Sequence, residues 1–215
     1  MTPLANRHDH RPAAPPSASS SHAGHPIFIV LEGLSCTGKS TIAPLLASRI
    51  NAVFLSTLLQ EYEPIRMRVD LSDSVQARMH FWLMANYTCS QRIRQELANG
   101  RSVVVESYFY RTLATHSALG VRDLPAIDWE EAALPDLAVQ LTVAEQARRR
   151  RLEERDLAHG MSIWARQIEA NAEQVRRIYL SFNLTMFTTD GLETAQVVDG
   201  LEQLINATAG VGHRD

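Results

Sequence analysis

The fold of this chain is decided by Gly33-Leu34-Ser35-Cys36-Thr37-Gly38-Lys39-Ser40, which fits the pattern G-x-x-x-x-G-K-[ST] in full. A short apolar run, Ile27–Leu31, precedes this stretch, and a helical pattern over Ser40–Ile50 follows it. A buried strand, a glycine-rich turn and a helix in this order predict a phosphate-binding loop. The glycines let the loop curl until backbone N–H groups face phosphate oxygens, and the helix N-terminus adds its positive end.

Two side chains of this loop have a defined task in such a site. Lys39 is expected to reach the β- and γ-phosphates of a nucleotide, and the Ser40 hydroxyl is expected to ligate Mg²⁺. Of the 21 basic residues in the chain, Lys39 is the single lysine, and it stands where a compact ammonium suits the site better than a planar guanidinium. The other residues expected to contact the nucleotide are Gly33, Ser35, Cys36, Thr37, Gly38 and Thr41.

The composition excludes several other classes of protein. Two cysteines cannot form a disulfide framework, and a net charge of −3 gives no reason to expect a nucleic-acid partner. Without a second lysine, the chain cannot form the N-K-x-D motif with which GTPases of the usual kind read guanine. No apolar run approaches the ~20 residues of a membrane span, and residues 1–26 lack the apolar core of a secretory signal. We therefore expect a cytoplasmic protein without a membrane partner.

One domain with a tail at each end is expected from the length and the local composition. Residues 1–26 hold five of the nine prolines and four of the eight histidines, with a serine cluster and few apolar residues. Such a segment cannot bury enough surface to offset its ordering entropy, so it is predicted to be disordered. The domain is predicted over residues 27–208, and a flexible C-terminus over residues 209–215.

Apolar strands alternate with helical patterns along the domain. Besides the first strand and helix, the sequence predicts strands at 52–55, 102–106, 137–143 and 196–198, and helices at 75–97, from about 144 to 157, at 162–182 and from 201. Continuous apolar strands separated by helices are typical of a parallel sheet that is covered on both faces. The predicted fold is therefore α/β, a three-layer P-loop NTPase fold with a five-stranded parallel sheet and helices on both faces.

Glu106 ends the apolar strand at 102–106. The carboxyl ends of parallel strands lie at the edge of the sheet where the phosphate loop is expected, so this carboxylate is a candidate to hold Mg²⁺ or to orient the attacking hydroxyl. The alternative is that Glu106 is simply the first polar residue of a loop.

Arginines gather on the predicted helix that follows residue 143. Arg149 and Arg150 have glutamates three or four residues away and are expected to pair with them, as on a solvated helix. Arg151 and Arg155 have fewer acids at these spacings. We expect these two to face a phosphate, because phosphoryl transfer needs cations around the transferring group.

With these features, the chain resembles P-loop kinases of the thymidylate kinase and deoxynucleoside kinase superfamily over about residues 27–200. The resemblance rests on Phe28–Gly33 entering the phosphate loop and Gly38–Thr41 leaving it, on Leu97–Gly100 before the strand at 103–106, on Leu113-Ala114, and on the arginine-rich helix. It implies that this helix belongs to an Arg-rich lid, and that the protein uses ATP and Mg²⁺ to phosphorylate a small-molecule acceptor.

Several positions depart from the pattern of thymidylate kinases. Where those kinases resemble one another in an Asp-Arg-Tyr triplet, this chain has Glu106-Ser107-Tyr108, and the arginine expected on the long helix is Ala85. Ser35 stands where those kinases usually have an acid. An acceptor phosphate would then be poorly neutralised, unless Arg111 or Arg92 compensates. We therefore expect an uncharged acceptor hydroxyl, on a nucleoside, a nucleoside-like natural product or an amino sugar.

Five residues are the candidates for binding this acceptor. Asn86 interrupts an apolar helical face beside Tyr87, so the pair is a candidate for reading a base; a core asparagine next to a packing tyrosine is the alternative. Deoxynucleoside kinases have an acid after the second strand, where this chain offers Glu61, so Glu106 or Glu61 would take the proton. Tyr108 and Arg111 complete the set.

Three alternatives stay open at this point. Within the kinases, a nucleoside monophosphate kinase acting on thymidylate is the second choice. A non-catalytic, NTP-binding regulatory protein is the choice from another class. The apolar side chains of Phe81, Trp82 and Met84 leave open a homodimer through the long helix.

Overall fold

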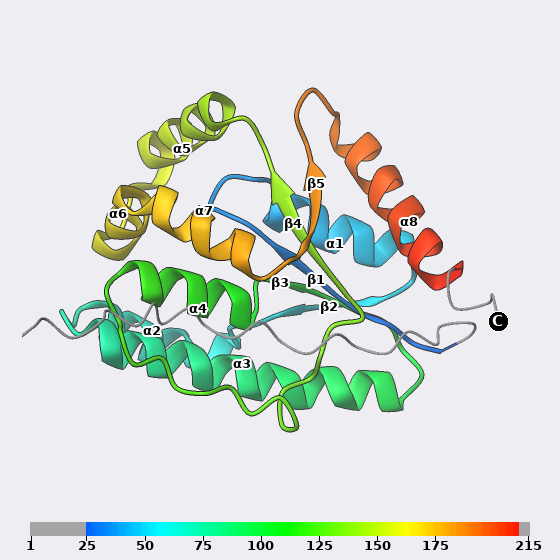
Figure 1. Ribbon diagram of the computed structural model, residues 1–215, viewed down its shortest axis with the longest axis horizontal. Coiled ribbons are helices and arrows are strands. Elements are labelled where there is room, and N and C mark those ends of the chain that lie inside the picture. Colours follow the sequence, from blue (N-terminus) through cyan, green and yellow to red (C-terminus); the bar gives the residue numbers. More distant parts are fainter. Residues whose placement is uncertain (1–24, 211–215) are drawn as a thin grey trace, which may run out of the picture.

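Five parallel strands form the centre of the structure, a computed structural model that describes residues 25–210 (Figure 1). In the order in which they pair, the strands are β2 (Val53–Ser56), β3 (Val103–Glu106), β1 (Phe28–Glu32), β4 (Leu137–Thr142) and β5 (Thr185–Thr188). Strand β1 is buried along its length and pairs with β3 on one side and β4 on the other. The strand order therefore changes direction at β1, which is where open α/β sheets bind ligands.

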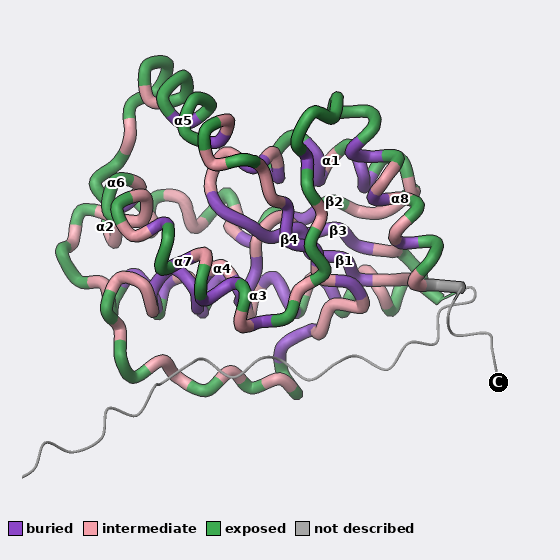
Figure 2. The backbone as a smooth tube through the Cα atoms, turned by 45° about the horizontal axis from the view of Figure 1, so that its top comes forward, coloured by how far each residue is buried: buried purple, intermediate pink, exposed green. Residues whose placement is uncertain are grey.

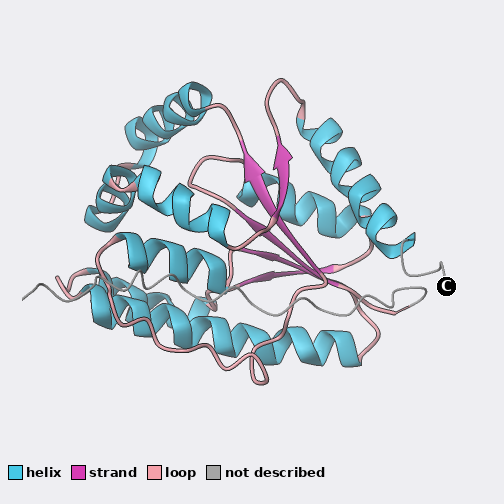
Figure 3. Ribbon diagram, viewed as in Figure 1, coloured by secondary structure: helices cyan, strands magenta, loops and turns pink. Residues whose placement is uncertain are grey.

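Helices cover both faces of this sheet and complete the three predicted layers (Figure 3). On one face lie α1 (Lys39–Arg49) and α8 (Thr194–Gly210); on the other lie α3 (Val75–Ala98), α4 (Phe109–Ala118) and α7 (Ala172–Ser181). The remaining helical segments are η1 (Gln60–Tyr62), α2 (Glu63–Asp70), α5 (Glu145–His159) and α6 (Ile163–Ala170). The buried residues concentrate along the strands and the helix faces that cover them (Figure 2).

The start and end of the long helix α3 follow from local chemistry. Ser74 is its N-cap, and the Ser74 hydroxyl accepts a hydrogen bond from the backbone N–H of Ala77 at 3.1 Å. Gly100 follows the helix with a positive φ of 75°, a conformation that glycine adopts without strain. The observed helix therefore begins at the predicted residue and ends one residue beyond the predicted one.

The strand predicted at residues 196–198 is wrong, because these residues belong to α8. Val197, Leu201 and Ile205 recur at helical spacing and are buried on the side of the sheet that α1 covers. The fifth strand is β5 instead, whose four residues are mostly exposed at the edge of the sheet. Edge strands lack the continuous apolar run by which a buried strand is found in a sequence.

The helix predicted at residues 162–182 is two helices, α6 and α7, which meet at Asn171. The Asn171 side chain donates from Nδ2 to the backbone oxygen of Gln167 at 2.8 Å, and its own backbone leaves the helical region with a φ of −108°. Asparagine competes in this way for backbone hydrogen bonds and so interrupts a helix. The apolar pattern continues across the break, which is why periodicity alone does not reveal it.

The tail predicted for residues 1–26 lies outside the described residues except for its last two positions, and so does most of the segment predicted at 209–215. Within residues 25–210, no helix combines the length and the apolar character that crossing a membrane requires.

Candidate functional site

The phosphate loop connects the carboxyl end of β1 to the first turn of α1, and its conformation depends on glycine. Gly33 and Gly38 have φ values of 132° and 102°. A Cβ at Gly33 would lie 2.5 Å from the backbone oxygen of Leu141, so a larger residue does not fit there. Gly38 is the N-cap of α1, and no side chain caps this helix. The helix N-terminus thus keeps its positive end for a phosphate.

Lys39 lies buried under this loop. Its Nζ donates hydrogen bonds to the backbone oxygens of Gly33 at 2.9 Å and of Leu34 at 2.8 Å. Burial lowers the pKa of the Lys39 ammonium to about 8, with a further lowering from the charge of Arg111. Burial thus makes the ammonium group of Lys39, the only lysine of the chain, easier to deprotonate than that of an exposed lysine.

Ser40 and Glu106 meet beside the loop. The Ser40 hydroxyl donates to Glu106 Oε1 at 2.5 Å, and so joins the first turn of α1 to the end of β3. A hydroxyl and a carboxylate oxygen side by side are ligands that suit Mg²⁺, which usually takes one or two protein oxygens and completes its shell with water and phosphate. The residues present therefore fit the predicted metal site.

Glu32 is a residue of the site for which the sequence analysis gave no role. It ends β1 with its side chain fully buried. Its carboxylate accepts one hydrogen bond from the backbone N–H of Tyr108 at 2.7 Å and one from the Tyr179 hydroxyl at 2.8 Å. Burial raises the pKa of this carboxyl to about 7. An acid directly after the apolar run Phe28–Leu31 was the signal for it in the sequence.

One cavity of about 690 Å³ opens at the phosphate loop and continues between α3 and α4. On the loop side it is lined by Ser35–Ile42, by Arg151 and Arg155 of α5, and by Thr189, Leu192, Thr194 and Val197 near the start of α8. The other side, here called the polar chamber, is lined by Arg78, Trp82 and Asn86 of α3 and by Thr112, Thr115 and His116 of α4. Glu106 and Arg111 line the same cavity, as do Ser56, Thr57, Leu58, Ser107, Tyr108 and Ile168.

The polar chamber follows from helix geometry. Arg78, Trp82 and Asn86 are four residues apart, so they lie along one side of α3. Asn86 is completely buried and donates from Nδ2 to Thr112 Oγ1 at 2.8 Å, which joins the two helices. The apolar face of α3 is thus interrupted by polar groups where the helix passes the cavity.

Arg78 joins several elements around this chamber. Its Nε donates to Asp70 Oδ1 at 3.1 Å and its Nη1 to His116 Nε2 at 3.2 Å. The guanidinium carbon lies 5.7 Å from the centre of the Trp82 ring and 5.2 Å from that of Trp164 in α6. Burial lowers the pKa of His116 to about 4, so this imidazole is neutral near pH 7 and accepts the hydrogen bond from Arg78.

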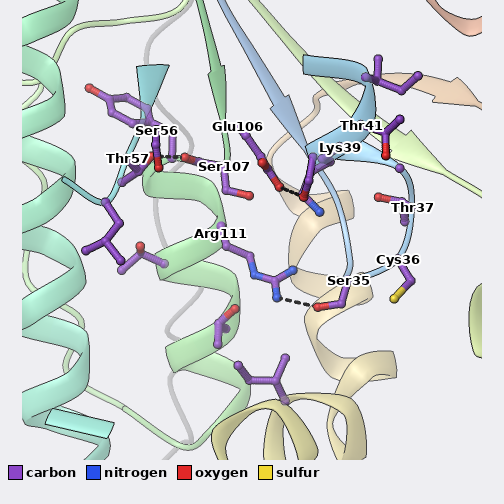
Figure 4. Close-up of a pocket in the computed structure, with 18 of the residues that line it drawn as sticks. Ser35, Cys36, Thr37, Lys39, Thr41, Ser56, Thr57, Glu106, Ser107 and Arg111 are labelled. Carbon is purple, nitrogen blue, oxygen red and sulfur yellow. Dashed lines mark hydrogen bonds between the residues drawn. The ribbon is translucent and has the colours of Figure 1, made fainter. Parts of the chain in front are cut away.

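Arg111 points from α4 to the phosphate loop (Figure 4). It donates to the backbone oxygen of Gly33 at 2.9 Å and to the Ser35 hydroxyl at 3.2 Å. Neither of these partners is a carboxylate, so the charge of Arg111 is not neutralised by either contact. An arginine is therefore present beside the loop, although Ser107 stands where thymidylate kinases have one. Arg92, the other residue considered for this role, does not line the cavity.

The arginines of α5 divide into two exposed ion pairs and two residues that line the cavity. Arg149 pairs with Glu145 and Arg150 with Glu154, both on the exposed side of the helix. Arg151 and Arg155 line the cavity, and Arg151 donates to the backbone oxygen of Cys36 at 3.5 Å. Arg148, for which the sequence predicts no role, is the most buried of the group and pairs with Glu145 and Glu169.

Two residues named for the acceptor do not line the cavity. Glu61 is exposed in η1. Tyr87 packs its ring edge against Phe109, and its hydroxyl accepts from the backbone N–H of Asp128 at 2.9 Å. One position separates Asn86 from Tyr87 on a helix, so the two side chains point about 100° apart and only one faces the cavity.

No protein-family model matches the chain, and no curated protein matches it in sequence. Its structure is similar to that of thymidylate kinase from Candida albicans, with a TM-score of 0.69 and 18% identity over 90% of this chain and 96% of that one. Thymidylate kinase from Ehrlichia chaffeensis gives a TM-score of 0.58 and 16% identity over 85% and 99% of the two chains. Deoxyadenosine kinase from M. mycoides, solved with bound dATP, gives a TM-score of 0.61 and 16% identity over 84% and 100%. The chain therefore has the fold of these P-loop kinases, as predicted.

Proposed function

We propose that the protein is a kinase that transfers the γ-phosphoryl group of ATP to a nucleoside or a nucleoside monophosphate. The observation that carries the proposal is the single cavity that joins the phosphate loop to the polar chamber, with Glu106 lining it. A kinase needs this arrangement, because donor and acceptor must meet in one site from which water is excluded. The similar solved structures are a deoxyadenosine kinase and thymidylate kinases, which supports an acceptor of this class.

The residues at the loop take the roles that phosphoryl transfer requires. Lys39 and the N-terminus of α1 would bind the β- and γ-phosphates, while Arg151 and Arg155 would face the transferring group. Ser40 and Glu106 would hold Mg²⁺, which when bound neutralises phosphate charge. An acceptor oxygen forms a bond to the γ-phosphorus as the bond to the β–γ bridging oxygen breaks, and ADP leaves. Where the acceptor is a hydroxyl, Glu106 takes its proton.

The charge around the cavity bears on the choice of acceptor. Glu106 is the one carboxylate among the described residues that line it, against Lys39, Arg78, Arg111 and two arginines of α5. A cationic amino sugar would find little to neutralise it there. Arg111, which contacts the loop without a carboxylate partner, favours an acceptor that carries a phosphate. An uncharged nucleoside, the first choice from the sequence, thereby becomes the second candidate, with Glu106 available as the base.

An acceptor screen tests the proposal. Purified protein is incubated with ATP and Mg²⁺ and with nucleosides, their 5′-monophosphates or aminoglycosides, and ADP release and product mass are measured. We expect product from at least one nucleoside or monophosphate and none from aminoglycosides, and Lys39→Ala should abolish it. If ATP binds and no acceptor of either class is phosphorylated, the non-catalytic alternative replaces this proposal.

A further inference from the structure

Arg148 of α5 has a partner for each of the five N–H groups that a guanidinium carries. Its Nε and Nη2 donate to the two carboxylate oxygens of Glu145, both at 2.9 Å. Its Nη1 and Nη2 donate to the two oxygens of Glu169 in α6, the first of them at 2.9 Å. The remaining N–H, on Nη1, donates to the backbone oxygen of Ser35 in the phosphate loop at 3.5 Å. The side chain is 2% exposed, so these groups are its surroundings in place of water.

Stability alone does not account for such a buried charge. Taking two charges out of water costs free energy that their attraction barely offsets, and apolar residues in the place of a buried ion pair are often as stabilising. A bidentate pair between arginine and a carboxylate does supply geometry, because two parallel hydrogen bonds must align at once. Arg148 makes one such pair within α5 and one to α6. These pairs therefore restrict how α5 is turned about its own axis.

Few other contacts hold α5 in place. Among the 15 residues of this helix, the buried ones are Arg148 and Leu152, and the helix projects away from the sheet (Figures 1 and 2). Glu145, in its first turn, also accepts a hydrogen bond from Arg176 of α7 at 2.6 Å. Because α5 has so little apolar contact, the ion pairs of Arg148 and Glu145 decide how it is oriented on α6 and α7.

Arg151 and Arg155 depend on this orientation. They follow Arg148 by three and seven positions, so the three side chains lie along one side of α5. Both line the cavity, and both are exposed, so packing does not fix their direction. Arg151 reaches the phosphate loop through a hydrogen bond to the backbone oxygen of Cys36 at 3.5 Å. A small rotation of α5 would turn both arginines away from a phosphate bound at the loop.

We infer that Arg148 is a positioning residue of phosphoryl transfer, which holds Arg151 and Arg155 towards the transferring group. Arg148 is not among the residues that line the cavity, and it contacts the phosphate loop at the backbone oxygen of Ser35. It therefore binds neither substrate and acts through the two arginines that follow it on α5. The inference rests on the proposed function, since it names what orients two residues of that reaction.

Two substitutions of Arg148 test the effect on rate. Arg148→Met removes the charge, and Arg148→Lys keeps it but cannot form the bidentate pairs. Both should lower kcat at least about tenfold and leave KM for the acceptor within about twofold of the wild type, because a misplaced cation weakens the transition state more than the ground state. Wild-type kcat in both variants overturns the inference.

The control is Arg150→Met, whose side chain is 82% exposed on the same helix and which should behave as wild type. All rates are measured at a temperature at which melting curves show every variant to be folded. If the wild type phosphorylates no acceptor, the proposed function and this inference fail together. If the wild type is active and the variants of Arg148 are equally active, the inference alone fails.

A cycle of variants separates positioning from a loss of stability. In an Arg151→Met/Arg155→Met background, the groups that Arg148 orients are absent. Adding Arg148→Met to it should therefore lower the rate of transfer by less than about twofold more. Single-turnover measurements with enzyme in excess of ATP keep this slow transfer measurable. A loss as large as in the wild-type background would mean that Arg148 acts independently of the two arginines, which contradicts the inference.

Arg148→Leu/Glu169→Leu removes both charges of the pair between α5 and α6. Its melting temperature should exceed that of Arg148→Met, because no carboxylate of Glu169 is left behind. Its kcat should nevertheless stay as low as in the single variant, since leucines restore packing and not the alignment of two bidentate pairs. A double variant with the kcat of the wild type would show that α5 is oriented without these pairs and would overturn the inference.

Discussion

The buried carboxylate of Glu32 accepts a hydrogen bond from the Tyr179 hydroxyl at 2.8 Å, which joins the residue in front of the phosphate loop to α7. Its other oxygen accepts from the backbone N–H of Tyr108, two residues after Glu106. One carboxylate thereby connects the residue in front of the loop, the turn after Glu106 and α7. The consequences of its burial can be measured.

Glu32 should make the free energy of unfolding depend on pH. Its pKa is about 7 in the folded protein and 4.5 as the ordinary value. Between these two values the folded state keeps a proton that the unfolded state has lost, so the contribution of Glu32 to stability falls as pH rises through this window. His116 acts in the opposite sense: its pKa is lowered to about 4, so its contribution rises with pH up to its ordinary pKa of 6.5. The effect of Glu32 is therefore read from a difference in urea unfolding: the free energy of unfolding of the wild type should fall relative to that of Glu32→Gln as pH rises from about 4.5 to 7. Identical profiles would contradict the assignment.

Tyr179→Phe is the companion variant. The Tyr179 hydroxyl donates to the ionised carboxylate and so lowers the pKa of Glu32 against the effect of burial. Removing it should raise that pKa further and extend the pH-dependent loss of stability to higher pH. If the profile moves to lower pH instead, the hydroxyl is not stabilising the ionised form.

ATP affinity should weaken above about pH 8 because of Lys39. The pKa of its ammonium is lowered from 10.5 to about 8, mainly by burial. Phosphate binding needs the cation, so the dissociation constant for ATP should rise by up to about tenfold per pH unit above that value. Titration with a fluorescent ATP analogue measures this. In Lys39→Met the dissociation constant should be high at every pH and lack this dependence.

Ser40→Ala and Glu106→Gln should impair the use of Mg²⁺ without affecting folding. The two side chains are hydrogen-bonded to each other, and Ser40 is exposed, so each substitution removes little packing from the core. We expect the Mg²⁺ concentration for half-maximal activity to rise and kcat to fall by about 10²-fold or more. Activity measured across a magnesium series tests this, with the far-UV circular dichroism spectrum and the melting temperature as folding controls.

Arg111→Met should distinguish the two candidate acceptor classes. If Arg111 neutralises an acceptor phosphate, the variant should lose about 10²-fold in kcat/KM on a monophosphate and much less on the matching nucleoside. Arg150→Met is the control, since Arg150 is exposed on α5 and pairs only with Glu154. Equal losses on both acceptors would place Arg111 on the donor phosphates instead.

Arg148→Met should destabilise the fold more than Arg150→Met. Arg148 is almost fully buried and forms ion pairs with Glu145 and Glu169. The substitution removes both of these ion pairs. Breaking a buried pair costs about 3 kcal/mol, and the partial exposure of both glutamates reduces this figure to about 2 kcal/mol. The exposed pair at Arg150 should cost less than about 1 kcal/mol. Urea unfolding of the two variants measures the difference.

Local patterns predicted most of the elements, and their failures have local causes. Strand β1 and the helix after it follow from an apolar run and a glycine-rich turn that has few other conformations. Strand β5 escaped prediction because it lies exposed at the edge of the sheet, and the segment 196–198, with its two adjacent valines, belongs to α8. Two apolar residues in a row fit either a strand or a helix, and only the partner that buries them decides between the two.

The sequence by itself determined the phosphate loop, with Lys39 and Ser40 in place, and the fold class around it. A loop of eight consecutive residues needs no distant contact to be found, because its chemistry is written in one short segment. Only the tertiary structure decided that Arg111 turns to this loop, that Asn86 faces the cavity while Tyr87 does not, and that Glu32 holds Tyr108 and Tyr179. These side chains come from helices and strands far apart in the chain, and which of them share a cavity depends on how the helices pack on the sheet.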